Sequence, residues 1–396
     1  MRIGYLVSHP IQYQAPLLRH LVAHGGLDLT ALFLSDFSLR SYVDPGFGVA
    51  VRWDVPLLEG YKSRFVPRFH GGGEVTPLNP LHGDLRHLLA GRIDVLWLHG
   101  YAQLANLRAL AAARALRIPV LLRCESNLAS HPRGRLKKAV KEVALRALFA
   151  RIDGFLAIGA ANADYYRHYG VPDERIHLMP YAVDNAFFRA RAAAAAPGRE
   201  AFRAELGLRP GVPVILFASK FQGRKRAGDL WRAYRALATD HGGPNAYLLF
   251  IGDGEGRAAI EAEARASGWD TVRFLGFRNQ TELPAFYDLC DVFVLPSEFE
   301  PWGLVVNEVM NCRRPVIVGD QVGSAPDLVR HGETGWVFRT GDVPALSACL
   351  RAAVADPART RAMGEAAWRR VGEWDFAADL AGLREAVAAV LPGGPP

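Results

Sequence analysis

Short apolar runs rich in β-branched and aromatic residues recur along the whole chain, and helix-forming stretches follow several of them. The run 291–296 has the sharpest boundaries, because Pro301 and Gly303 separate it from the next helix-forming stretch. Strands that alternate with helices predict parallel sheets built from βαβ units, so we expect an α/β fold. The expected strands are 2–8, 27–34, 94–98, 119–123 and 154–158 in the first half, and 212–218, 246–251, 272–275, 291–296 and 315–318 in the second.

The length of the chain favours two domains. At 396 residues it exceeds what one ordinary hydrophobic core contains. We expect a first domain over 1–186, a second over 187–372, and a terminal helix within 373–396 that crosses back to the first domain. The alanine-rich stretch 189–199 contains a Pro-Gly pair and is predicted to be the linker.

Composition limits the class of protein. Half of the residues are hydrophobic and 22% are charged, which is typical of a soluble globular protein. No apolar run reaches the roughly 18 residues of a membrane span, so a cytoplasmic location is expected. The four cysteines are far apart and form no C-x-x-C pair, which argues against a disulfide framework or a zinc knuckle.

Carboxylates directly follow the expected strand 291–296. In open α/β sheets, ligands bind beyond the carboxyl ends of the strands, beside helix N-termini that favour phosphate. Glu308 interrupts an apolar face and is predicted to be functional, since a carboxylate there is costly unless it is hydrogen-bonded. Glu298 is more typical of a solvated acid. If the helix begins near residue 302, its apolar stripe contains Leu304, Val305, Glu308, Val309 and Cys312.

The stretch 297–310 resembles the Glu-x7-Glu motif of retaining nucleotide-sugar glycosyltransferases, in particular glycosyltransferase family 4, with Glu300 and Glu308 as its glutamates. The resemblance implies a GT-B fold, in which two Rossmann-like, doubly wound parallel-sheet domains face a central cleft that holds the donor. It implies that Glu308 accepts hydrogen bonds from the ribose and that Glu300 reaches the donor sugar or its phosphates. Trp302, Gly303 and Leu304 are expected beside the donor.

Other stretches of the second half are similar to the same family. Lys220 and Lys225 resemble its G-R-x-x-x-x-K motif and would bind the donor diphosphate, with lysine where arginine is usual at 220. A lysine lacks the bidentate fork of arginine, so we expect a less rigid grip on phosphate at Lys220. The remaining donor-binding residues that the resemblance implies are Gly252, Asp253 and Gly254, similar to a G-D-G turn, and Phe277 and Arg278, in the loop where relatives bind the nucleobase.

The first half matches the family more loosely. Its first loop has no glycine, whereas many members have a glycine-rich loop there. His99 ends strand 94–98, where a family histidine lies near the donor sugar, and R-C-E-S from Arg123 is similar to the R-G-E-S of some members. His99 thus joins Lys220, Lys225 and Glu300 as the expected catalytic set. The residues expected on the acceptor or sugar side are His9, Tyr13, Arg123, Glu125 and Asn127.

The net charge of +7 is concentrated in the first half. Through residue 184 there are 22 basic and 15 acidic residues, and the remainder has 25 of each. The basic stretch 133–151 has two alternative explanations. It is either a solvated helix face or a peripheral contact with the anionic inner face of the cytoplasmic membrane. Its basic residues, set against the single acid Glu142, are Arg133, Arg135, Lys137, Lys138, Lys141, Arg146 and Arg151.

Together these motifs predict a retaining, metal-independent hexosyltransferase that uses a UDP- or GDP-sugar and a glycan, lipid-linked or small-molecule acceptor, as in polysaccharide biosynthesis. No cofactor besides the donor and no nucleic-acid partner is expected. A sugar-nucleotide epimerase and a non-catalytic nucleotide- or glycan-binding protein remain alternatives. A phosphorylase would need a pyridoxal-lysine motif, and a nicotinamide oxidoreductase would need a glycine fingerprint after the first strand; neither is found.

Overall fold

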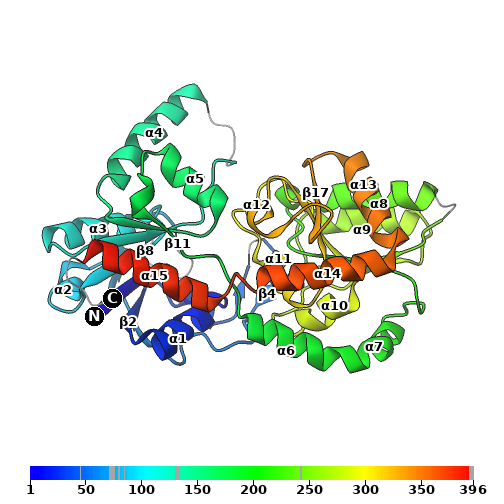
Figure 1. Cartoon of the computed structure of the whole chain (residues 1–396), viewed down its shortest axis with the longest axis horizontal. Helices are drawn as coiled ribbons and strands as arrows, with labels where there is room; N and C mark the ends of the chain where they lie inside the picture. The colour runs from blue at the N-terminus through cyan, green and yellow to red at the C-terminus, as the bar shows by residue number, and fades with distance from the viewer. Residues whose placement is uncertain are drawn as a thin grey trace. The chain divides into compact units, whose positions relative to one another are not determined.

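The computed structural model describes residues 1–44, 46–70, 76–78, 81–83, 85–129, 134–240 and 243–391 (Figure 1). The chain forms two compact units. The first contains Met1–Tyr42, Val55–Val183 and Asp375–Pro396, and the second contains Val43–Asp54 and Asp184–Trp374. Each unit has its own parallel sheet with helices packed on it, which confirms the predicted α/β class.

The first unit is built on a seven-stranded sheet of order β11-β10-β9-β8-β1-β2-β5, in which all neighbours are parallel. The strand order reverses between β1 and β8. The strands are β1 Arg2–Val7, β2 Asp28–Phe33, β5 Lys62–Phe65, β8 Val95–His99, β9 Val120–Arg123, β10 Gly154–Ala157 and β11 Ile176–Leu178. The helices are α1 Gln14–Gly25, α2 Leu85–Leu89, α3 Leu104–Ala115, α4 Arg135–Phe149, α5 Ala160–His168 and α15 Phe376–Val390.

The second unit has a six-stranded parallel sheet of order β14-β13-β12-β15-β16-β17, which reverses between β12 and β15. Its strands are β12 Val214–Ala218, β13 Tyr247–Ile251, β14 Val272–Phe274, β15 Val292–Leu295, β16 Val316–Gly319 and β17 Gly335–Phe338. Its helices are α6 Asn185–Ala195, α7 Arg199–Glu205, α8 Ala227–Asp240, α9 Arg257–Ala266, α10 Leu283–Leu289, α11 Leu304–Asn311, α12 Ala325–Leu328, α13 Val343–Ala355 and α14 Pro357–Val371.

Short elements complete the described chain. They are the 3-10 turns η1 Phe37–Leu39, η2 Asp173–Arg175, η3 Ala196–Gly198 and η4 Gly223–Lys225, and the two-stranded pairs of β3 Tyr42–Val43 with β4 Ala50–Val51 and β6 Arg68–His70 with β7 Leu81–His82. The central strands of both sheets are buried along nearly their whole length. Parallel strands covered on both faces need such continuous apolar runs, which explains why these strands were recognisable in the sequence.

The predicted linker at 189–199 is wrong. This stretch is helical, from α6 through the turn η3 into α7. Alanine has the highest intrinsic helix propensity, so the alanine run extends the helix rather than breaking it. The side chain of Asp184 caps α6 by accepting a hydrogen bond from the Phe187 amide at 2.9 Å.

The last described helix, α15, packs on the first unit, where Figure 1 shows it in red beside α1. Leu380 and Leu383 join the same buried cluster as Ile3 of β1. Asp379 on this helix is fully buried, 3.3 Å from the guanidinium of Arg123. Burial raises the pKa of Asp379 to about 7, although the nearby Arg123 charge opposes the rise. Within the described part of the chain, no helix is both long and apolar enough to cross a membrane.

Candidate active site

In each unit, residues singled out in the sequence follow the two strands on either side of the point where the strand order reverses. In the first unit, His9 follows β1 and His99 ends β8. In the second unit, Lys220 follows β12 and Glu300 follows β15. The carboxyl ends of strands at such a switch point form the usual ligand-binding crevice of open α/β sheets. The fold therefore gives each unit a candidate half-site.

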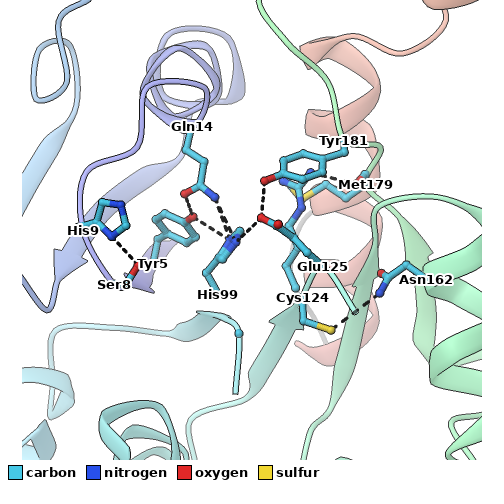
Figure 2. Close-up of polar contacts among 12 residues, drawn as sticks. Tyr5, Ser8, His9, Gln14, His99, Cys124, Glu125, Asn162, Met179 and Tyr181 are labelled. Atoms are coloured by element: carbon cyan, nitrogen blue, oxygen red, sulfur yellow. Dashed lines mark hydrogen bonds and ion pairs between the residues drawn. The ribbon is translucent and has the colours of Figure 1, made fainter. Parts of the chain in front are cut away.

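The half-site of the first unit is centred on His99 (Figure 2). Its Nδ1 atom lies 3.0 Å from the Tyr5 hydroxyl, and the side-chain amide of Gln14 lies within 3.3 Å of both ring nitrogens. Glu125 Oε1 lies 3.6 Å from His99 Nε2, and the hydroxyl of Tyr181 donates to the same carboxylate oxygen. Hydrogen bonds thus fix the orientation of the imidazole from several sides.

Glu125 remains ionised beside this histidine. Burial by itself would raise the pKa of Glu125, but the hydrogen bond and charge of His99 and the hydroxyl of Tyr181 outweigh it and hold the pKa below its usual value. The ionised carboxylate can therefore accept a hydrogen bond from a sugar hydroxyl beside the imidazole.

His9 and Tyr13 lie in the loop between β1 and α1. His9 Nδ1 is 2.9 Å from Ser8 Oγ, and its ring packs against Phe37 at 4.4 Å between centroids. Burial, and then the charge of His99, lower the pKa of His9 to about 4, so its ring is neutral at pH 7. Tyr13 meets Tyr181 edge to face at 5.7 Å.

Arg123 and Asn127 have structural environments. Arg123 is only 1% exposed, and its guanidinium donates to the carbonyls of Met179 and Pro180 at 3.3 and 3.0 Å. Asn127 is also buried, and its side-chain oxygen accepts from the amide of Ala129 at 3.1 Å. Arg123 thus supports the half-site from the interior, with its guanidinium 5.1 Å from the centre of the Tyr181 ring.

In the second unit, two residues of the expected catalytic set contact each other directly. Lys225, in η4, donates a hydrogen bond to Glu300 Oε2, and the two side chains are only 10% and 14% exposed. Arg224 Nη1 lies 3.8 Å from the same oxygen. Burial lowers the pKa of Lys225, whereas the charge of Glu300 opposes that shift. The two groups form a nearly buried ion pair at the switch point.

Lys220 has a different partner. Its Nζ atom lies 2.7 and 3.0 Å from the two carboxylate oxygens of Asp44. Asp44 was not predicted as a site residue, because a long stretch of sequence separates it from β12, the first strand of the second unit's six-stranded sheet.

The glycine turn after β13 allows a close backbone approach. Gly252 has a positive φ of 118°, and a Cβ atom there would lie 2.0 Å from the Ser219 carbonyl oxygen. Only glycine fits at this position. The carboxylate of Asp253 forms an ion pair with Arg257, in which Oδ2 lies 2.8 Å from Nη1.

The expected nucleobase loop follows β14. The Arg278 guanidinium lies 3.2 Å from Glu282 and 5.6 Å from the centre of the Phe286 ring, while Phe277 packs edge to face on Phe47 at 4.9 Å. Arg278 is thus already paired within its own loop.

The apolar face predicted for α11 is wrong, because the buried residues lie on a different side of the helix. The helix begins at Leu304, after Gly303 with a positive φ of 91°, and Leu304, Val305 and Glu308 are only half-buried. Apolar residues occur on several faces of this helix, so periodicity did not define the packed one. Trp302 is buried, and its indole donates to Asn307 at 2.9 Å. The packed face contains Val306, Asn307, Val309, Met310 and Asn311.

Glu308 accepts a hydrogen bond from the Tyr287 hydroxyl at 2.7 Å. Burial raises the pKa of Glu308 to about 7, although that hydrogen bond acts in the opposite direction. Its carboxylate can therefore change protonation near neutral pH.

Among the described residues, no group of three or more His, Cys, Asp or Glu side chains is arranged to hold a metal ion.

Residues 198–370 match the family model "Glycosyl transferases group 1", and residues 10–182 match "Glycosyl transferase 4-like domain". The chain belongs to glycosyltransferase family 4. D-inositol 3-phosphate glycosyltransferase of Nocardia farcinica is 30% identical to it over 259 residues, which are 63% of this chain and 56% of that protein. α-D-kanosaminyltransferase of Streptomyces kanamyceticus is 27% identical over 263 residues, 64% and 66% of the two chains. This glycosyltransferase thus spans little more than half the length of the first relative.

Solved structures confirm the GT-B fold of the glycosyltransferase. HepE of Anabaena in complex with UDP superposes with a TM-score of 0.73 at 18% identity, over 98% of this chain and 100% of that one. Sucrose-phosphate synthase from Thermosynechococcus elongatus gives a TM-score of 0.70 at 20% identity, over 98% of each chain.

Several residues of the glycosyltransferase's half-sites carry no motif. Tyr5 lies inside a strand, Gln14 in the first turn of α1, and Tyr181 after β11. Their contacts with His99 and Glu125 depend on the parallel order of β1, β8 and β9. An alternating inward and outward pattern could not identify Tyr5, because its strand is buried on both faces.

Proposed function

We propose that this glycosyltransferase is a retaining hexosyltransferase that moves a sugar from a UDP- or GDP-sugar to a hydroxyl group of a glycan, lipid-linked or small-molecule acceptor. The observation that carries the proposal is the basic cluster at the switch point of the second unit, where Lys220 and Lys225 lie beside the carboxyl ends of β12 and β15. A diphosphate bound there would meet two ammonium groups and the N-terminus of α11.

We propose the following chemistry at this cluster. The bond between the anomeric carbon and the diphosphate oxygen breaks, and its electron pair leaves with the diphosphate. The acceptor oxygen bonds to the anomeric carbon on the same face, and its proton passes to the departing phosphate oxygen. Lys220 and Lys225 stabilise the negative charge that develops on the leaving group, a contribution that is often the largest in such sites.

The glutamates have separate roles in the proposal. Glu308 accepts hydrogen bonds from the ribose hydroxyls, while its bond to Tyr287 fixes the carboxylate. Glu300 holds Lys225 in place and faces the phosphate or sugar side of the donor. In the first unit, His99 and Glu125 orient hydroxyl groups of the transferred sugar or acceptor.

The test is transfer itself. The protein is incubated with UDP- and GDP-sugars and hydroxyl acceptors, release of UDP or GDP is followed, and the anomeric configuration of the product is read by NMR. We expect nucleotide release and a product with the donor's configuration, unaffected by EDTA. Inverted configuration or EDTA sensitivity would contradict the mechanism. An epimerase would convert the sugar without an acceptor, and a binding protein would release no nucleotide.

We also propose that α4 binds an anionic membrane surface. Helix α4 docks on its own unit through Leu145 and Phe149, whereas Val140 and Val143 are 62% and 70% exposed. These two exposed apolar side chains lie on the same helix as exposed Lys137 and Lys138. Arg133 lies outside the described residues.

Co-sedimentation with anionic and neutral vesicles tests this surface. Each basic residue near an anionic leaflet contributes about 1 kcal/mol, so binding should be reversed by salt. The variant Lys137→Glu, Lys138→Glu, Lys141→Glu should lose binding. The matched variant Arg235→Glu, Arg265→Glu, Arg361→Glu, with the same change of charge elsewhere, should keep it. A wild-type protein that ignores anionic vesicles at low salt would refute the proposal.

A further inference from the structure

The segment Val43–Asp54, called the strap below, belongs to the second unit although the residues on both sides of it belong to the first. Its strand β4 lies among the elements of the second unit (Figure 1). Near the start of the strap, the Asp44 Oδ1 atom accepts hydrogen bonds from the amides of Gly46 and Phe47 at 2.8 and 3.0 Å and so closes a turn. The same carboxylate binds Lys220.

The strap contacts three parts of the proposed donor site: Lys220, the nucleobase loop and the glycine turn. The Phe47 ring packs on Phe277 of the nucleobase loop, and Lys220 Nζ lies 4.8 Å from the centre of the Phe47 ring. The Gly46 carbonyl approaches the glycine turn so closely that a Cβ atom on Gly254 would lie 2.9 Å from its oxygen. An anion and an aromatic ring of the chain itself therefore contact the groups proposed for phosphate and base.

The far end of the strap is held by polar contacts. The Asn279 side chain donates to the Arg52 carbonyl at 2.6 Å, and the amide and hydroxyl of Thr281 donate to Asp54. Burial raises the pKa of Asp44, but Lys220 and the two turn amides outweigh that effect and leave the pKa below its usual value. Asp44 is therefore an anion at neutral pH.

We infer that the strap is an internal competitor of the donor, with the Asp44 carboxylate on Lys220 in place of a donor phosphate and the Phe47 ring on Phe277 in place of the nucleobase. The inference rests on the donor site proposed above. A nucleoside diphosphate must displace Asp44 from Lys220 before it binds there. The measured affinity for the nucleotide is then the affinity of the open form multiplied by the fraction of molecules whose strap is open.

Asp44→Asn is the sharpest variant. The asparagine oxygen can still accept from Gly46 and Phe47, so the turn is kept while the charge facing Lys220 is removed. We expect UDP or GDP to bind on the order of tenfold more tightly in calorimetric titrations, since charge-assisted hydrogen bonds are about twice as strong as neutral ones. The matched control is Asp28→Asn, because Asp28 forms a Lys–Asp pair of the same 2.7 Å length with Lys62 in the other unit.

Hydrogen exchange gives a second measurement on the wild-type protein. If nucleotide displaces the strap, the amides of Gly46 and Phe47 should exchange faster when UDP or GDP is bound. Slower exchange there, or equal nucleotide affinity in wild type and Asp44→Asn, would overturn the strap inference and leave the donor site standing. If neither nucleotide binds to any of the variants, the proposed function itself fails, and the inference with it.

Discussion

Breaking the Lys225–Glu300 pair should cost stability, and substituting both residues together should cost less than the sum of the two single losses. Both side chains are nearly buried and hydrogen-bonded to each other. Removing one partner of such a pair costs about 3–5 kcal/mol, because the other charge stays buried without compensation. In Lys225→Met, Arg224 still lies 3.8 Å from Glu300, so we expect the lower end, about 3 kcal/mol. That loss corresponds to a fall in Tm of about 6–12 °C for a domain of this size.

The assay is a double-mutant cycle on Lys225→Met, Glu300→Gln and the combined variant, with unfolding free energies from urea titration. We expect a coupling energy of about 1.5–2 kcal/mol, within the range measured for residues in contact. Lys62→Met, Asp28→Asn and their combination serve as the control cycle, since that pair is exposed and should couple by less than about 1 kcal/mol. Losses that simply add in the Lys225–Glu300 cycle would refute the buried-pair reasoning.

Three further outcomes are expected. Lys220→Ala should lower kcat/KM for the nucleotide-sugar at least about tenfold with an unchanged circular dichroism spectrum, and unaltered kinetics would remove Lys220 from the donor site. Affinity for the nucleotide-sugar should fall by up to about tenfold per pH unit below pH 7, because protonated Glu308 accepts hydrogen bonds from ribose hydroxyls less well. The variant Glu308→Gln should abolish this pH dependence, whereas Glu300→Gln should keep it. The free energy of unfolding should fall as pH rises from about 4 to 7, because Asp379 keeps its proton over that range in the native protein but not in the unfolded chain. In urea titrations, Asp379→Asn should weaken this dependence of the unfolding free energy on pH. An unchanged dependence in that variant would contradict the prediction.

The strands and the second-unit motifs were predictable from the sequence because each has a local cause. A parallel strand covered on both faces is a continuous apolar run, and Gly252 must be glycine to approach Ser219. Lys220, Lys225 and Glu300 occur at strand ends, where the α/β pattern already indicates ligand binding.

The contacts among these residues depend on distant parts of the chain. Asp44 reaches Lys220 across a separation of 176 residues, and no periodicity marks the strap that carries it. The interior position of Arg123 depends on Asp379 from α15. The alanine run of α6 was mispredicted for a local reason. Its composition is typical of linkers, but alanine has a strong helix propensity.

The return of α15 to the first unit sets an order of events during synthesis. The first unit is encoded at the start of the chain, yet its core includes Leu380, Leu383 and Val387. On a ribosome, residues 184–374 must emerge before that core can close, whereas domains usually fold in the order in which they are made. The second unit, whose sheet and helices come from one continuous stretch, can therefore complete its core first, while the nascent first unit still exposes the apolar face that α15 will cover.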